Sequence, residues 1–420
     1  MLKGFRDFLP QTEIIRRNLI ENIENTFRSF GFVPIDTPAL EYAEILLGKG
    51  GGETEKQIYR FKDNGERDVA LRFDLTVPFA RFVAAHKGEL CFPFKRYHIG
   101  KVWRGENTQR GRYREFTQCD FDIIGSNSPS SDFEIIYLIR TTFLNLGVDV
   151  SIHVNHRGLF NRFLTNIGQI EKSVEVLRTV DKLSKVGEEE TLKSLSELTG
   201  EANAQKILEF IGAKGSFSEI LNRIIELSGG PSPESERLAS LQNYMIDTGT
   251  EPFILSPSIT RGLDYYTGVV FETFLKELPD IGSICSGGRY DNLAGLYSKD
   301  KEAVSGVGTS IGLDRLIAAL EALEKLPSAN AHTTAIACLD IEKSGQYHAL
   351  AQKLREEGVS CEVMLDPNNE KQLIKQFMLA EKKGLRYVII PGENRTVTLR
   401  DLTSRQNTEM TIEEVIQKIK

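Results

Sequence analysis

The feature that most constrains the fold is a pair of alternating segments on either side of an arginine-rich loop. "FKRYHIGKVWR" (94–104) and "REFTQCDFDIIG" (114–125) both alternate apolar with polar residues. A repeat of two residues is typical of a β-strand, and two such strands flanking a turn-rich loop favour antiparallel pairing. The sequence therefore predicts an antiparallel sheet in the first large domain.

The rest of the chain has a different periodicity. From about residue 158 to 250 helical periodicity prevails, with few strand signals. After a linker, strand-like segments at 333–339, 360–365 and 387–392 alternate with two helix-like segments, which is typical of a small α/β domain with a largely parallel sheet. We predict an α+β domain over 1–325, with a helical insertion at about 158–250, followed by an α/β domain over 332–420.

Charge and cysteine content exclude several classes of function. A net charge of −7 argues against a protein that coats nucleic acid non-specifically, although local basic patches are compatible with a nucleic-acid partner. No apolar run reaches the ~18 residues of a membrane helix. The five cysteines are scattered without a Cys-x-x-Cys pair, which predicts a reducing cytoplasm and neither a zinc site nor a disulfide framework.

The loop between the two alternating segments is strongly basic around the acid Glu106. Arginines two residues apart on a strand point to the same side and can grip phosphate in a planar fork, whereas a solvated hairpin would need no such arrangement. Both interpretations stay open for this set. Its members are Lys95, Arg96, Lys101, Arg104, Arg110, Arg112 and Arg114.

Two acidic segments could line a site for a small polar ligand. In "RFDLTVPFARF" (72–82), Asp74 and Thr76 are expected on one face of an extended segment that ends at Pro78; a helix cap is the alternative. In "FTQCDFDIIG" (116–125), three polar residues share one face of a strand, as a binding floor or as a solvated face. They are Gln118, Asp120 and Asp122.

Two glycine-rich segments do not match nucleotide fingerprints. "GKGGGE" (48–53) reads as a loop, and "GVGTSIG" (306–312) has the spacing G-x-G-x-x-x-G without a following βαβ unit. The second segment is predicted to be a strand that enters a helix, with Arg315 in the first helical turn. A further segment, "RGLDYYTGVVFE" (261–272), crowds Arg261, Tyr265 and Tyr266 at the start of an apolar strand, which favours a pocket wall.

Together these segments resemble the histidyl-tRNA synthetase family, which is a class II aminoacyl-tRNA synthetase family. The resemblance rests on "KGFRDFLP", the arginine-rich hairpin, "RGLDYYTG", "GGRYD" and "GVGTSIGLDRL". It implies a class II antiparallel catalytic domain with a helical insertion, and an α/β anticodon-binding domain at the end of the chain. It also implies a homodimer in the cytoplasm whose substrates are L-histidine, ATP with Mg²⁺, and the tRNA for histidine.

The resemblance implies a role for each candidate residue. Asp74, Thr76 and Gln118 would hold the α-amino group of histidine. Asp122 and Tyr266 would contact the imidazole, and Tyr265 would line the same pocket. Arg104 and Arg261 would be the catalytic residues, contacting histidine and the α-phosphate. ATP would also be bound by Glu106 at the adenine edge and by Arg112 and Arg315 at the outer phosphates.

The implied reaction needs no covalent catalysis. The histidine carboxylate attacks the α-phosphorus of ATP and expels pyrophosphate, so the protein contributes positioning and charge stabilisation. Two other functions stay open: a synthetase-like regulatory subunit of ATP phosphoribosyltransferase, and a synthetase paralogue with altered RNA specificity. The first is disfavoured because such relatives lack the last domain and have lost arginines of the kind present here at 104, 112, 261 and 315.

Overall fold

The computed structural model describes residues 1–47, 57–251, 253–259, 265–298, 303–327, 334–365, 370–392 and 396–419. The chain divides into two compact units, Met1–Asp7 with Asn18–Leu326 and Phe8–Arg17 with Pro327–Lys420. The predicted loop at 48–53 lies outside the described residues.

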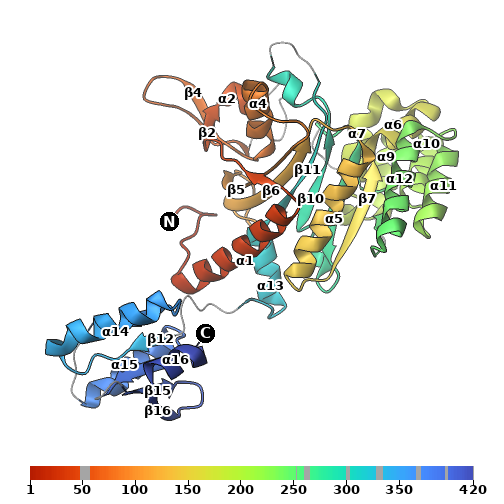
Figure 1. The fold of residues 1–420 in the computed structure, drawn as a ribbon. Coiled ribbons are helices and arrows are strands. Elements are labelled where there is room, and N and C mark those ends of the chain that lie inside the picture. The colour runs from red at the N-terminus through yellow and green to blue at the C-terminus, as the bar shows by residue number, and fades with distance from the viewer. Residues whose placement is uncertain are drawn as a thin grey trace. The chain divides into compact units, whose positions relative to one another are not determined.

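The first unit is built on an eight-stranded sheet in the order β1-β5-β6-β11-β10-β9-β7-β8 (Figure 1). All neighbours from β5 to β7 are antiparallel, and the pairing of β5 with β6 runs from Phe94–Ile124 to Trp103–Glu115. This confirms the predicted antiparallel sheet. The strands are β1 (Val33–Pro34), β5 (Phe94–Trp103), β6 (Glu115–Ile124), β7 (Val150–His156), β8 (Ile254–Leu255), β9 (Val269–Leu275), β10 (Cys285–Tyr290) and β11 (Gly306–Gly312).

The two faces of β6 have different surroundings. Its apolar residues Cys119, Phe121 and Ile123 are buried, and the Phe121 ring lies 4.6 Å from that of Phe27 in α1 (Pro10–Ser29). Helices α5 (Pro129–Asn145) and α13 (Leu313–Ala322) pack on the same strand. The opposite, polar face of β6 stays available for a site.

A smaller sheet and two helices stand beside this site. The sheet has the order β2-β4-β3, and its strands are Leu40–Tyr42, Asp68–Leu71 and Arg60–Lys62. The helices are α2 (Ala43–Leu47) and α4 (Thr76–His86).

The extended segment predicted around Asp74 is wrong, because Thr76 is already the first residue of α4 and Pro78 lies in its first turn. Proline is well tolerated there since the first-turn N–H groups have no intrahelical partner.

Residues 157–248 are mainly helical. α11 begins with a capping box formed by Ser216 and Glu219, and α12 begins with Ser232 as its cap and Pro233 as its first residue. Such caps satisfy the free N–H groups of a helix start. The helices are α6 (Arg157–Asn166), α7 (Ser173–Val180), α8 (Leu183–Val186), α9 (Glu188–Thr199), α10 (Glu201–Ile211), α11 (Phe217–Leu227) and α12 (Pro233–Thr248).

The second unit has a five-stranded sheet in the order β13-β12-β14-β15-β16. The three strands β13, β12 and β14 are parallel, as predicted, but β15 and β16 add an antiparallel hairpin that the prediction missed. The elements are β12 (Thr334–Ile336), α14 (Ser344–Glu356), β13 (Cys361–Val363), α15 (Glu370–Lys382), β14 (Tyr387–Pro391), β15 (Thr396–Asp401), β16 (Asn407–Thr411) and α16 (Ile412–Ile419). None of the helices in the described part of the chain is long and apolar enough to cross a membrane.

Candidate functional site

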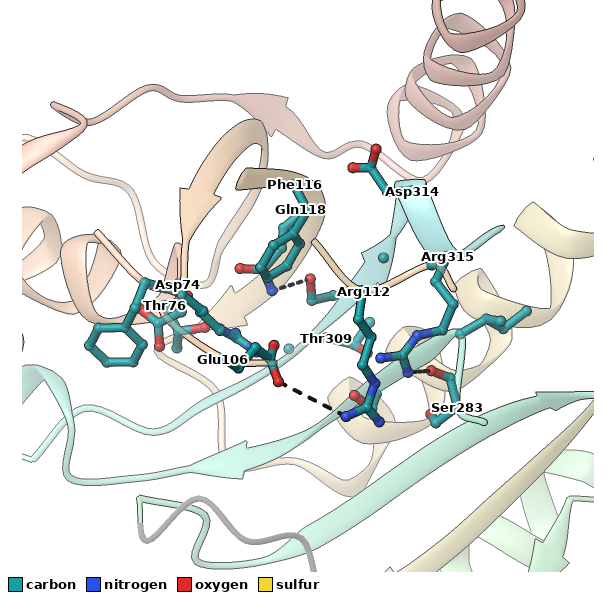
Figure 2. A pocket seen from close by; sticks show the side chains of 18 of the residues that line it. Asp74, Thr76, Glu106, Arg112, Phe116, Gln118, Ser283, Thr309, Asp314 and Arg315 are labelled. Atoms are coloured by element: carbon teal, nitrogen blue, oxygen red, sulfur yellow. Dashed lines mark hydrogen bonds and ion pairs between the residues drawn. The ribbon is translucent and has the colours of Figure 1, made fainter. Parts of the chain in front are cut away.

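A cavity of about 260 Å³ opens on the polar face of the large sheet (Figure 2). Its walls come from β6, β10 and β11, the loop after β5, and the starts of α4 and α13. Ten of the eleven predicted site residues line it, whereas Arg261 lies outside the described residues. The ten are Asp74, Thr76, Arg104, Glu106, Arg112, Gln118, Asp122, Tyr265, Tyr266 and Arg315.

Asp74 presents a free carboxylate oxygen to the cavity. Its Oδ1 accepts the backbone N–H of Val77 at 3.1 Å, which fixes the side chain at the start of α4. Its Oδ2 is buried and has no hydrogen-bond partner among the described residues. Burial raises the pKa of this carboxyl from 3.8 to about 6. A buried acceptor without a partner is costly, so Asp74 is suited to a cationic ligand.

Gln118 offers a second acceptor of the same kind. Its Nε2 donates to the Ser310 hydroxyl at 2.7 Å (Figure 2). Its Oε1 is buried and, in the described part of the chain, has no hydrogen-bond partner. The cavity is therefore lined by two acceptors, on Asp74 and Gln118, that no described residue of the protein uses.

Asp122 is held by two neighbours. Its Oδ2 lies 2.6 Å from Nη2 of the fully buried Arg96, and its Oδ1 accepts the Tyr290 hydroxyl at 2.6 Å. Burial raises the pKa of Asp122, and the positive charge of Arg96 opposes that shift. Gly308 on β11 faces this carboxylate, and a Cβ there would lie 1.8 Å from Oδ1. Only glycine leaves room for Asp122 at this position.

Three tyrosines form an aromatic wall. The ring centres of Tyr265 and Tyr266 are 4.7 Å apart, and Tyr265 meets Tyr290 edge-on at 6.3 Å. All three line the cavity, and Tyr266 and Tyr290 are buried. Tyr265 and Tyr266 therefore form part of a cavity wall, as the sequence predicts. Tyr290, from the segment "GGRYD", is the third tyrosine of this wall.

A hydrogen bond to the backbone orients the side chain of Arg104. Its Nε donates to the Phe73 carbonyl at 2.9 Å, and its guanidinium carbon lies 5.1 Å from the Phe116 ring centre. Among the described residues neither Nη atom has a hydrogen-bond partner. The fork is therefore fixed in orientation and open at its tip, which suits an oxyanion.

Arg112 and Arg315 lie on the other side of the cavity from Asp74 and Thr76 in Figure 2. Arg315 is the third residue of α13, as predicted, and its Nη1 donates to the Ser283 carbonyl. Arg112 lies 4.0 Å from Glu106, which is a loose ion pair at a partly exposed position. The weak pairing of Arg112 leaves positive charge at this side of the cavity for an anionic ligand.

The wider basic set does not act as one group. Lys95 pairs with Glu134, Lys101 with Glu115, and Arg96 with Asp122. Only Arg104 and Arg112 of the set line the cavity. Lys95, Arg96 and Lys101 lie on β5, before the loop that contributes to the cavity wall.

Several residues that line the cavity were not predicted from the sequence. Phe116, Tyr290, Ser283, Thr309 and Ser310 all line the cavity without having been singled out as site residues. For Tyr290 a signal was present, since "GGRYD" belongs to the motifs that carry the family resemblance. Ser283, Thr309 and Ser310 are small hydroxyl residues whose pattern carries no signal of its own.

No group of three or more His, Cys, Asp or Glu side chains placed to hold a metal ion occurs among the described residues. Chemically, the cavity combines free acceptors for a cation at one end with guanidinium groups for anions at the other. The three tyrosines and the buried carboxylate of Asp122 line the same cavity. This set suits a zwitterionic amino acid beside a polyphosphate.

Comparisons with known proteins agree with this chemistry. A family model described as "Histidyl-tRNA synthetase" matches residues 4–316, and one described as "Anticodon binding domain" matches residues 333–420. The curated histidine–tRNA ligase of Treponema denticola is 50% identical, covering 100% of this chain and 97% of the relative. That of Clostridium tetani is 42% identical, covering 100% and 98%.

Solved structures give the same picture. The histidyl-tRNA synthetase of Nostoc sp. PCC 7120 superposes with a TM-score of 0.89 at 30% identity, covering 100% of this chain and 98% of that one. An ATP phosphoribosyltransferase regulatory subunit/histidyl-tRNA synthetase from Bacillus halodurans C reaches a TM-score of 0.74 at 23% identity, covering 90% and 96%. At that identity the second likeness concerns the fold alone.

Proposed function

We propose roles for the residues of the cavity from the premise that this chain belongs to the histidyl-tRNA synthetase family. Its activity is that of an ATP-dependent histidine–tRNA ligase, with histidine, ATP and tRNA as substrates. Histidine and ATP form histidyl-adenylate and pyrophosphate, and histidine is then transferred to the 3′ end of the tRNA. The regulatory-subunit alternative is disfavoured, because full-length curated relatives are ligases and the anticodon-binding domain is present.

The α-ammonium group of histidine is proposed to bind between Asp74 and Gln118, with Thr76 beside them. The observation that carries this assignment is a pair of buried acceptors in one cavity, Asp74 Oδ2 and Gln118 Oε1, to which no described residue donates. An ammonium has three donors and no acceptor, so it satisfies both atoms at once. Without such a ligand each acceptor keeps its desolvation cost.

The imidazole ring is proposed to lie among Asp122, Tyr265 and Tyr266. A neutral imidazole has one N–H donor and one acceptor nitrogen, and a carboxylate beside a tyrosine hydroxyl complements both edges. Arg96 and Tyr290 already bind Asp122, which fixes its direction toward the ring. A ligand without these ring nitrogens would lose both contacts, so we expect the cavity to favour histidine over an analogue with an apolar ring.

The arginines are proposed to divide the triphosphate between them. Arg104, with its open fork, would contact the histidine carboxylate and the α-phosphate, and Arg261 would meet them from the other side by family resemblance. Arg112 and Arg315 would hold the outer phosphates, and Glu106 the adenine edge. Guanidinium groups that are fixed before the reaction stabilise the charge that develops at the α-phosphorus without reorganising.

Mg²⁺ is proposed to enter bound to the outer phosphates of ATP. This ion keeps several waters and needs only one or two carboxylates beside substrate phosphates, so a three-residue cage is not required. Arg112 and Arg315, the residues proposed at the outer phosphates, supply no metal ligand, so the phosphates and water would hold the ion. When bound, Mg²⁺ neutralises part of the charge on the phosphates and orients them.

We also propose domain boundaries at 1–325 and 332–420, a homodimer, and a cytoplasmic location. The two matched family models support the boundaries. Half-exposed Tyr42 and Phe61 lie in one cross-strand row with Val69, and we propose that a second copy covers this apolar face. The five cysteines form no disulfide in the described part of the chain, which fits a reducing cytoplasm. A sedimentation mass of a single chain would contradict the dimer.

Charging of transcribed tRNA tests the function and the paralogue alternative together. We expect the purified full chain to attach histidine to the tRNA for histidine and to leave a tRNA for another amino acid uncharged. The same preparation should catalyse histidine-dependent ATP–pyrophosphate exchange. Exchange without discrimination between the two tRNAs would favour a paralogue of altered RNA specificity, and absence of exchange would contradict the ligase.

The assignment of Asp74 predicts a pH dependence of histidine use. Its pKa of about 6 means that the carboxylate loses its charge, and with it the attraction for an ammonium, as the pH falls through 6. Below pH 6 we expect kcat/KM for histidine to fall up to about tenfold per pH unit in the wild type. This fall should exceed the fall in kcat/KM of Asp74→Asn over the same range. The variant itself should be about 10–100-fold weaker at pH 8, from loss of a charged hydrogen bond.

The Asp74→Asn control removes a confounding effect, because the imidazole of free histidine titrates in the same range and acts equally on both proteins. Only the difference between the two profiles reports Asp74. Parallel profiles would show that Asp74 does not meet the ammonium.

A further inference from the structure

The orientation of the Gln118 amide is decided by a residue behind it. An amide can turn either its oxygen or its nitrogen toward a ligand, and only the oxygen accepts from an ammonium. Here Nε2 is committed to the Ser310 hydroxyl at 2.7 Å, so the carbonyl oxygen is turned to the cavity. Ser310 lies on β11, directly across from Asp120 on β6.

Ser310 must have a second partner for this orientation to be enforced. A hydroxyl has one proton, and if that proton were given to the Gln118 oxygen the amide would turn around. The hydroxyl is also hydrogen-bonded to the Asp120 carboxylate. An ionised carboxylate can only accept, so the Ser310 proton is used there and its oxygen can only accept from Gln118.

Asp120 does not reach the cavity itself, and Ser310 is its hydrogen-bonded link to the cavity lining. It is 1% exposed and is not among the residues that line the cavity. Burial raises its pKa to about 7, so it is ionised at pH 8. His98, opposite it on β5, is neutral because burial lowers its pKa to about 3. The charged and titratable groups around Asp120 are Arg72, Arg96, Asp74, Asp122 and His98.

We propose that Asp120 and Ser310 are positioning residues that hold the Gln118 carbonyl toward the cavity and thereby set the affinity for the α-ammonium group of histidine. This rests on the proposed function, in which Gln118 meets that group. The relay runs from Asp120 through Ser310 to Gln118, and each step follows from which atom has a proton to give. It explains why an acid is buried beneath the site without reaching it.

The test compares histidine with imidazolepropionic acid, which has the same ring and carboxylate but no amino group. At pH 8, Ser310→Ala should weaken histidine binding about tenfold, the cost of one hydrogen bond to a charged group. Binding of imidazolepropionic acid and the KM for ATP should stay unchanged. Ser310→Thr, which keeps the hydroxyl, should restore most of the affinity. The histidine affinity of Asp120→Asn should lie between those of the wild type and Ser310→Ala, because its amide can donate as well as accept.

A purely structural role would behave differently. If Ser310→Ala weakened both ligands equally, or left histidine binding unchanged, the relay would be overturned. Gln118→Leu separates that outcome from failure of the proposed function itself. If Gln118→Leu left the ratio of the two affinities as in the wild type, Gln118 would not meet the ammonium, and both the contact and the relay would be wrong.

Discussion

Arg104→Gln is expected to lower kcat for histidine-dependent ATP–pyrophosphate exchange by about 10²–10³-fold, the usual cost of losing one preorganised oxyanion donor. Arg104 lines the cavity with its Nε bound to the Phe73 carbonyl, which leaves the tip of the fork for a phosphate or carboxylate oxygen. Because the charge at the α-phosphorus grows in the transition state, kcat should fall more than the KM for either substrate rises.

Two controls separate this effect from general damage. Arg104→Lys keeps the charge but loses the planar fork, so it should recover only part of the activity. Arg67→Gln removes an exposed surface ion pair with Asp63 and should leave kcat unchanged. Arg104 is only partly buried, so thermal unfolding of Arg104→Gln should move little. Exchange within threefold of the wild type would refute the catalytic role.

Much of the site could be predicted because strand periodicity is a local property. Alternation placed Gln118 and Asp122 on one face of β6, and the glycines of 306–312 marked a strand that enters a helix at Arg315. The arginine hairpin was also found from its pattern. These inferences needed only neighbours along the chain.

The prediction failed for Arg96, whose position depends on residues from distant segments of the chain. Arg96 was grouped with the phosphate-binding arginines, but its position on β5 buries it against Asp122 and the Phe79 ring, 4.0 Å from its guanidinium carbon. Spacing cannot tell which of two arginines on one strand is exposed. The hairpin of β15 and β16 is different because its signal is local: buried Val397 and Leu399 alternate with less buried threonines in β15.

Arg96→Met is expected to destabilise the first unit by about 3–5 kcal/mol at pH 8, because it leaves the carboxylate of Asp122 buried without its countercharge. Arg96 is fully buried and Asp122 is 2% exposed, so the carboxylate would stay largely desolvated after the loss of its partner. The ion pair of 2.6 Å is the interaction removed, together with the contact to Phe79. Denaturant unfolding, followed by a probe in this unit, measures the loss.

The loss should depend on pH in a defined direction. The pKa of Asp122 is already raised by burial and would rise further without Arg96. A carboxyl whose folded pKa exceeds its unfolded value favours folding at low pH, and that contribution disappears as the pH rises through the folded pKa. Arg96→Met should therefore be closer to the wild type in stability at pH 5 than at pH 8.

The double variant Arg96→Met/Asp122→Asn decides whether the buried charge is the cause. With the carboxylate replaced by a neutral amide, most of the stability lost in Arg96→Met should return. The pH dependence of the stability loss that Arg96→Met shows should also vanish. Activity should not return, since Asp122 is proposed to contact the imidazole. If the double variant were as unstable as Arg96→Met at pH 8, the loss would come from packing around Phe79 and not from an uncompensated charge. The buried arginine would then contribute volume rather than charge to the floor of the site.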